Sequence, residues 1–327
     1  MEKYPMLMQP YCKQTVWGGN RLKDQYGKGD FDSLGEAWEL SCRKEESSVI
    51  ANGPCKGLPL YEYEKHRGKA DDFPILIKFI DSASDLSVQV HPGSSDALLE
   101  VQRPKTEMWY IIDADSNAEI VYGLKNGVTA EEFETACLKG ANINCCLNRI
   151  PVHSGDVYFI PAGQVHAIGK GILLAEIQQN SDTTFRLYDY DRKDKNGKTR
   201  ELQIEQGLKS VKGRSCTEIN SLRFNGNFKN KELLDSVCLT DCEFFSCDLV
   251  TLTEKSSVEL KASKEFFAIV CVCGNGKLIC NSSEFYFGPL ETYYVPSGCA
   301  PVKISGDAKL LCVSCKDISA HSLDKIQ

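Results

Sequence analysis

The stretch SGDVYFIPAGQVHAI, residues 154–168, decides the fold because a related stretch returns later in the chain. Residues 288–304 read GPLETYYVPSGCAPVKI, and both copies carry a short apolar strand followed by a Pro-x-Gly turn. Upstream, KTEMWYII (105–112) matches SKEFFAIV (263–270), so the repeat extends over more than one strand. From about residue 74 onward, runs rich in Val, Ile, Tyr and Phe alternate with Gly, Pro, Asn and Asp. The sequence therefore predicts a mainly all-β chain of two jelly-roll β-barrels with a few short helices.

The repeat also predicts how the chain divides. A third, weaker match lays SVQVHP (87–92) on SVELKA (257–262), in the right order. The second copy has no histidine at the matched positions. We therefore expect residues 1–230 to form a metal-binding barrel with short helical insertions, and 231–327 a degenerate barrel without a metal site. Four segments have the periodicity of helices: 58–67, 95–103, 129–139 and 201–211.

Composition excludes several classes of function. The 327 residues are 42% hydrophobic and 25% charged, which is ordinary for a globular protein, and the net charge of −7 argues against a nucleic-acid partner. No apolar run is long enough to span a membrane, and the N-terminus does not resemble a signal peptide.

Many of the sixteen cysteines lie in apolar, strand-like runs, so we expect reduced thiols and a cytoplasmic protein. Cys312-x-x-Cys315 has no second CxxC, and we expect it to pack rather than to bind metal.

Polar residues share one face of a predicted strand in the first copy. Gln89 and His91 alternate with two valines in DLSVQVHP (85–92), Glu107 belongs to the next strand and His166 to a later one. A jelly roll brings such strands together with their inward residues converging. Two imidazoles, a carboxylate and an amide oxygen can hold Zn²⁺, Fe²⁺, Mn²⁺ or Co²⁺ and leave a position open. The competing interpretation is that these histidines only form structural hydrogen bonds.

Six motifs occur in an order that covers essentially the whole chain. They are VWGGNRL (16–22), GEAWELS (35–41), SVQVHP (87–92), KTEMWYI (105–111), IPAGQVHAIG (160–169) and NSDTTFRLYDYDR (180–192). Together they resemble the type I mannose-6-phosphate isomerases of the short bacterial kind. The long helical domain of larger members is absent and only the segment 129–139 stands in its place, so the motifs do not identify what forms a lid over the pocket.

The resemblance implies a cupin metalloenzyme that interconverts mannose 6-phosphate and fructose 6-phosphate, with one zinc ion per chain. By motif match, the zinc ligands are Gln89, His91, Glu107 and His166. Arg186 matches the position of the family's catalytic arginine. Glu176 matches a position where the family has a carboxylate near the reacting carbons. The positions that line the substrate pocket are Ser87, Lys78 and Lys105.

The chemistry of these side chains suits the implied reaction. Isomerisation moves a proton between adjacent carbons through an enediol, which requires a base within reach of both. Glu176 is the first candidate, and the alternative is a buried carboxylate paired with Lys78 or Lys105. Arg186 can stabilise charge on oxygen in the transition state, unless it is paired with a nearby aspartate. Lys78 and Lys105 could receive the phosphate.

Two other functions remain open from the sequence. One is an Fe(II) cupin dioxygenase, which would have little use for Gln89 as a fourth ligand. The other is a bicupin that binds a sugar phosphate without catalysis. In each case the partner is a small molecule, with no nucleic acid and no membrane, and we expect a monomer or a weak homodimer.

Overall fold

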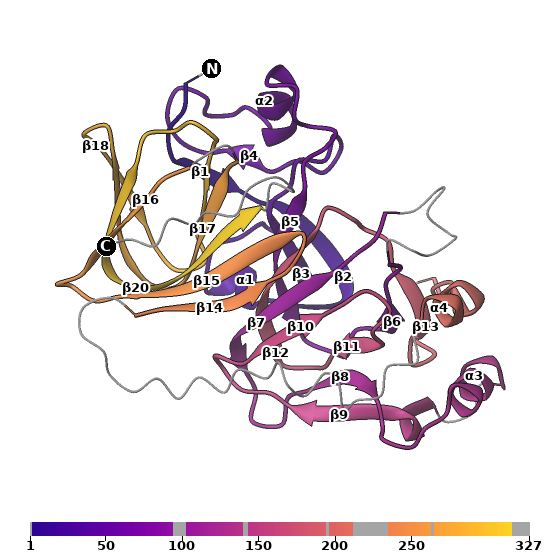
Figure 1. The fold of residues 1–327 in the computed structure, drawn as a ribbon. Helices are drawn as coiled ribbons and strands as arrows, with labels where there is room; N and C mark the ends of the chain where they lie inside the picture. The colour runs from indigo at the N-terminus through magenta and orange to yellow at the C-terminus, as the bar shows by residue number, and fades with distance from the viewer. Residues whose placement is uncertain are drawn as a thin grey trace. The chain divides into compact units, whose positions relative to one another are not determined.

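The computed structural model describes residues 2–93, 103–139, 143–193, 196–211, 235–262 and 265–315. Strands dominate, and the described helices are all short, so the predicted all-β fold with a few helices is confirmed (Figure 1). The helices are α1 (Arg21–Asp24), α2 (Leu60–His66), α3 (Ala130–Lys139) and α4 (Ile204–Ser210), with a 3-10 turn η1 (Ile143–Cys145). None of these helices has the length and apolar character needed to cross a membrane.

The chain forms two compact units, and each draws on separate parts of the sequence. One unit contains Met1–Tyr11, Trp38–Lys78 and Asn227–Gln327, and the other contains Cys12–Ala37 and Phe79–Gly226. The predicted boundary at residues 230 and 231 lies outside the described residues, so the division into 1–230 and 231–327 stays a prediction.

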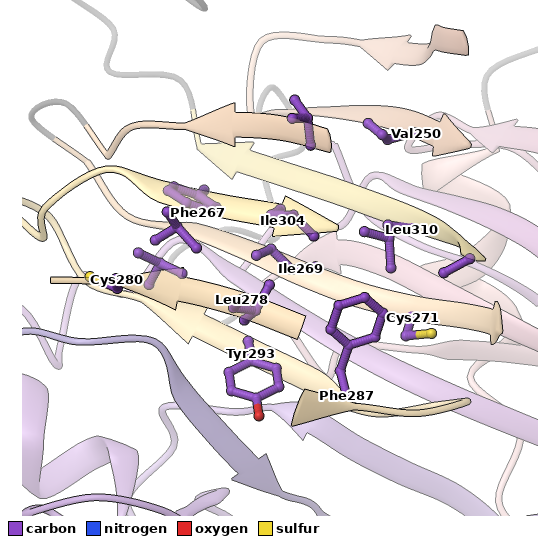
Figure 2. Packing of buried hydrophobic residues seen from close by; sticks show 14 of the residues in the cluster. Val250, Phe267, Ile269, Cys271, Leu278, Cys280, Phe287, Tyr293, Ile304 and Leu310 are labelled. Carbon is purple, nitrogen blue, oxygen red and sulfur yellow. The ribbon is translucent and has the colours of Figure 1, made fainter. Parts of the chain in front are cut away.

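The unit with the C-terminal strands is built on a nine-stranded sheet in the order β14-β15-β20-β17-β19-β1-β4, with β16 on β20 and β18 on β17. Its strands are β14 (Asp235–Asp241), β15 (Phe245–Leu252), β20 (Val302–Cys315), β17 (Phe267–Cys280), β19 (Thr292–Val295), β1 (Met6–Gln9), β4 (Val49–Ile50), β16 (Ser257–Leu260) and β18 (Ser283–Phe287). Figure 2 shows Phe267, Ile269, Leu278 and Ile304 in the buried cluster of this unit. The strands of this unit therefore pack around an apolar core.

The other unit has two sheets. A six-stranded sheet runs β10-β7-β12-β5-β2-β3, and a five-stranded sheet runs β13-β6-β11-β8-β9. The first contains β10 (Val157–Ile160), β7 (Glu107–Ala114), β12 (Ile172–Gln179), β5 (Ile75–Ser82), β2 (Tyr11–Gly19) and β3 (Leu34–Leu40). The second contains β13 (Phe185–Tyr188), β6 (Val88–Val90), β11 (His166–Ile168), β8 (Glu119–Leu124) and β9 (Leu147–Pro151).

Two apolar clusters fix which face of the short strand β6 points inward. Val88 and Val90 pack with residues of α3 and α4, such as Phe133, on the helix-covered face of the five-stranded sheet. The other cluster joins the two sheets and contains Trp109 and Ile168. Because side chains alternate along a strand, the polar residues of β6 face away from the helices.

Three of the predicted helices can be tested, and all three form. Segments 58–67, 129–139 and 201–211 contain α2, α3 and α4, whereas 95–103 lies almost wholly outside the described residues. A capping box begins α3: the Glu132 amide donates to Thr129 Oγ1 at 3.2 Å, and the Thr129 amide donates to Glu132 Oε2 at 2.9 Å.

The internal repeat is present in the sheets, but its register differs from the sequence match. Ile160 pairs with Glu107 between β10 and β7, and the matched Val295 pairs with Phe267 between β19 and β17. The position of Glu107 is therefore occupied by Phe267, two residues beyond the Glu265 that the sequence match had selected. A shift of two residues keeps every side chain on its original face, so the apolar pattern alone does not reveal it.

No disulfide bond joins the cysteines of the described residues. Cys312 and Cys315 lie in β20, and burial raises the pKa of the Cys312 thiol to about 12. A thiol that stays protonated is a poor metal ligand, which agrees with a packing role for this pair.

Candidate metal centre

The strand β6 brings two predicted ligands to the same face and places a third beside them. Gln89 lies at the centre of β6, with His166 of β11 as its partner on one side and Arg186 of β13 on the other. His91 follows two residues later on the same face. Three of the predicted site residues are thus positioned around Gln89 by backbone pairing.

His91, Glu107 and His166 form the one group of three metal-ligating side chains found among the described residues. One ligand atom from each lies within 4.8 Å of the others, and all three side chains are buried. His91 Nε2 lies 3.4 Å from Glu107 Oε2, and His166 Nε2 lies 3.5 Å from Glu107 Oε1. The predicted set of two imidazoles and one carboxylate is therefore assembled.

Backbone carbonyl groups determine the tautomer of both histidines. His91 Nδ1 lies 2.8 Å from the Thr183 carbonyl oxygen, and His166 Nδ1 lies 2.8 Å from that of Gln164. A carbonyl oxygen can only accept a hydrogen bond, so each Nδ1 must carry the proton. In a neutral imidazole, Nε2 then has a free lone pair, and on both rings that atom faces Glu107. Metal-binding histidines are commonly oriented in this way.

Burial keeps the site in the protonation state that a cation requires. Burial, reinforced by the charge of Lys105, lowers the pKa of His91 to about 3, and burial also lowers the pKa of His166. Burial alone would raise the pKa of Glu107, but the ammonium group of Lys105 holds it well below its ordinary value. Two neutral imidazoles and an ionised carboxylate therefore converge.

Two of the converging atoms are acceptors that lack any donor. Within the described part of the chain, neither His91 Nε2 nor Glu107 Oε1 has a hydrogen-bond partner, and Glu107 Oε2 is met by the ammonium group of Lys105 at 3.0 Å. Buried acceptors that face one another at this distance are unfavourable unless a cation lies between them. This donor set fits a divalent metal ion with nitrogen and oxygen ligands.

The amide of Gln89, the fourth predicted ligand, lies beside His166. Its Nε2 lies 3.3 Å from His166 Nε2, at the rim of the acceptor cluster. The oxygen and nitrogen of a glutamine amide exchange places by a flip about one bond, so the amide can present either atom there. Gln89 is thus positioned to offer an oxygen ligand.

Lys105 and Glu176 extend the centre on one side. The Lys105 amino group lies 3.0 Å from Glu107 Oε2 and 3.7 Å from Glu176 Oε1. The second oxygen of Glu176 accepts a hydrogen bond of 3.0 Å from the indole of Trp109. Glu176 and Lys105 are both buried. The ion pair with Lys105, which the sequence left open as the alternative to a role of Glu176 as a base, is therefore present.

Arg186 and Ser87 lie beside the centre. The Arg186 Nε donates to Ser87 Oγ at 3.3 Å, and another guanidinium nitrogen donates to the Glu201 carbonyl at 2.9 Å. Arg186 forms no ion pair with any described residue, so the expected alternative of a salt bridge to an aspartate is wrong. Asp189 instead binds Arg192 and Arg200, which satisfy its carboxylate.

Lys78 lies on β5, in the part of this strand that belongs to the segment Trp38–Lys78 of the other compact unit. Its amino group is buried and lies over the ring of Trp38, 4.8 Å from the ring centroid. A cation over an indole face is a favourable contact, and it explains how a lysine is accommodated in the apolar run of β5.

Trp109 lies beside the predicted site residues, although no motif of the sequence indicated it. This residue lies two positions after Glu107 on β7, so strand alternation places both on one face. That spacing was visible in the motif KTEMWYI, but an aromatic residue in a strand usually belongs to the core. The backbone carbonyls that orient the histidines carried no signal in the sequence.

Comparisons with known proteins agree with this geometry. The family model of the phosphomannose isomerase type I catalytic domain matches residues 6–138. The mannose-6-phosphate isomerase ManA of Bacillus subtilis is 38% identical over 319 residues, which cover 95% of this chain and 99% of that protein. A mannose-6-phosphate isomerase of Streptococcus mutans is 33% identical over 315 residues, covering 94% of this chain and 97% of that protein.

A solved structure extends the likeness to the fold. The crystal structure of the mannose 6-phosphate isomerase from Bacillus subtilis superposes with a TM-score of 0.83 at 31% identity. The match covers 96% of this chain and 100% of that one. Sequence identity of this extent over nearly the full length means that the chain belongs to the type I phosphomannose isomerase family.

Proposed function

We propose that the chain is a metal-dependent aldose–ketose isomerase that interconverts D-mannose 6-phosphate and D-fructose 6-phosphate. The observation that carries the proposal is the continuous buried arrangement of His91, His166, Glu107, Lys105 and Glu176. A metal site adjoins a carboxylate whose position is fixed by a lysine and an indole. The family relationship supports the same activity.

We assign one zinc ion per chain to Gln89, His91, Glu107 and His166. Two imidazole nitrogens with oxygen donors and an open position form a donor set that catalytic zinc accepts. When bound, zinc supplies a Lewis acid that polarises the sugar carbonyl. The Lys105 ammonium group beside Glu107 keeps that carboxylate ionised and in place.

Glu176 is the proposed base that moves the proton between C1 and C2 of the open-chain sugar. One of its oxygens is occupied by the indole of Trp109, and the other faces Lys105. The ammonium group stabilises the ionised carboxylate and can stabilise negative charge on the substrate. Both side chains are buried, so their charges interact more strongly than they would in water.

Arg186 is the proposed catalytic arginine. Its guanidinium group is always charged, and two of its nitrogens are held by Ser87 and by a backbone carbonyl. A fixed cation can stabilise oxyanion charge that develops in the transition state without a cost of reorganisation. Ser87 faces the same side of the strand region as Gln89 and His91 and is proposed to contact the sugar.

We propose that Lys78 and Lys105 contribute to substrate binding, as the family resemblance implies. The ion pairs of Lys105 favour a role at the reacting end of the sugar rather than at its phosphate. The three arginines near Asp189 supply more positive charge than this carboxylate neutralises, which favours an anionic ligand despite the net charge of −7. The proposal also includes a monomer or weak homodimer in the cytoplasm, without nucleic-acid or membrane partners.

A coupled assay with metal analysis tests the proposal. Purified protein should convert mannose 6-phosphate to fructose 6-phosphate, lose activity with a chelator and regain it with Zn²⁺. Oxygen consumption that depends on Fe(II) would instead identify a dioxygenase. Binding of mannose 6-phosphate without exchange of its C2 hydrogen with solvent would identify a non-catalytic bicupin.

A further inference from the structure

Trp109 connects the metal centre to the proposed base. It is fully buried on β7, directly opposite Glu176 on β12. Its indole nitrogen donates to Glu176 Oε2 at 3.0 Å. Its ring meets the ring of His166 edge-on, with centroids 5.5 Å apart and an angle of 71° between the planes. A single side chain therefore contacts both a ligand of the metal centre and the carboxylate.

The hydrogen bond restricts the carboxylate in a specific way. A carboxylate can turn about its last torsion, which is broad and nearly two-fold. The indole of Trp109 holds Oε2 of Glu176, so the direction of Oε1, which lies 3.7 Å from the Lys105 amino group, is fixed as well. An indole N–H only donates, so it does not compete with the substrate for the proton.

We infer that Trp109 is a positioning residue that fixes the orientation of the Glu176 carboxylate for proton transfer. The inference rests on the proposed isomerase function. Positioning of a base contributes to the rate through geometry, so its loss lowers kcat rather than substrate affinity.

The hydrogen bond between Trp109 and Glu176 can be tested by a measurement that does not depend on enzyme activity. The chain has three tryptophans, so ¹⁵N labelling of tryptophan gives three indole N–H signals, and Trp109→Phe identifies one by its disappearance. We expect Glu176→Ala to move that signal upfield and to speed its hydrogen exchange, whereas Glu176→Gln keeps an acceptor oxygen and retains most of the shift. An unchanged signal in Glu176→Ala overturns the inference.

Steady-state kinetics test whether loss of the hydrogen bond to Glu176 slows proton transfer. Trp109→Phe keeps an aromatic ring against His166 but removes the donor, and we expect kcat to fall by roughly 10- to 100-fold, the effect of losing a hydrogen bond to a charged group. KM for mannose 6-phosphate should change by less than about threefold, and bound zinc should stay at one ion per chain. The deuterium isotope effect on kcat with substrate labelled at C2 should rise, because proton transfer becomes more rate-limiting.

Tyr158→Phe is the matched control, because Tyr158 is a buried aromatic donor opposite Trp109 on β10 and its hydroxyl binds Asp156. This variant should keep the wild-type kcat and isotope effect. Wild-type kcat in Trp109→Phe, or a loss of kcat that follows a loss of zinc, overturns the inference. Inactive wild-type protein would instead refute the proposed function, and the indole signal would still report on the contact.

Discussion

The ammonium group of Lys105 offers a quantitative test of the electrostatics of the site. It lies 3.0 Å from an oxygen of Glu107 and 3.7 Å from an oxygen of Glu176. At an effective dielectric constant of about 20, these pairs contribute roughly 5.5 and 4.5 kcal/mol of attraction before desolvation is subtracted. Desolvation offsets much of this sum. We therefore expect Lys105→Met to destabilise the metal-free protein by about 3–5 kcal/mol, as when one partner of a buried pair is removed.

Zinc should reduce that loss. The ion would bring its own positive charge to Glu107, and in the wild type it is repelled by Lys105. Zinc should thus stabilise Lys105→Met more than it stabilises the wild type. In terms of Tm, we expect a loss of roughly 10 °C without metal, at about 2–4 °C per kcal/mol, and a clearly smaller loss with zinc.

Thermal unfolding of the wild type and of Lys105→Met, each measured with chelator and with excess zinc, gives the four Tm values that the comparison needs. Lys23→Met is the control, because the 2.7 Å pair between Lys23 and Asp32 lies at the surface. This control should change Tm by no more than about 2 °C under either condition, since exposed pairs contribute little. An equal loss of Tm in Lys105→Met with and without zinc would show that the lysine and the metal are not coupled.

Three further variants test the site and the scaffold. His91→Ala should lower zinc affinity, measured by chelator competition, by more than the roughly 10- to 100-fold typical of losing a group outside the ligand set. Asp189→Asn should cost about 2 kcal/mol at pH 7 in urea unfolding. Although burial opposes it, the arginine partners lower the pKa of Asp189, so its stabilisation is present above about pH 4 and is lost as the pH falls through the lowered value. A constant difference between pH 7 and pH 2 would contradict this reasoning. Gly18→Ala would bring a Cβ into overlap with the Ser33 carbonyl oxygen and should destabilise by about 1–3 kcal/mol in urea unfolding.

Strand alternation was sufficient to predict much of the site. It placed Gln89 and His91 on one face, and the order of motifs supplied Glu107 and His166. Alternation of side chains depends only on the local backbone of the strand, so it can be predicted from the sequence without knowledge of which strands pair. The same rule applies to Trp109, but a buried aromatic residue gives no sign in the sequence of whether its N–H has a functional acceptor.

Features that depend on distant strand pairing could not be predicted. β1 pairs with β19, Met6 against Tyr294, and so joins the N-terminal strand to the unit of the C-terminal sheet. Nothing in the local pattern of Met6–Gln9 selects that partner. Likewise, the contacts of Lys105 with two carboxylates depend on the register of β7 against β12, which a sequence does not display.

The register of the repeat shows which residues of the second barrel stand where the first barrel has its acceptors. Its ladder places Phe267 at the position of Glu107 and, two residues along, Cys312 at the position of Glu176. A cluster of buried acceptors is unfavourable unless a cation and a substrate satisfy it, whereas an apolar group of similar size stabilises the same position by packing. Phe267 is in fact part of the apolar core of that unit. Once a copy no longer bound metal, substitution toward packing residues would therefore stabilise it, and the retained acceptors of the first barrel are best explained by ligands that bind there.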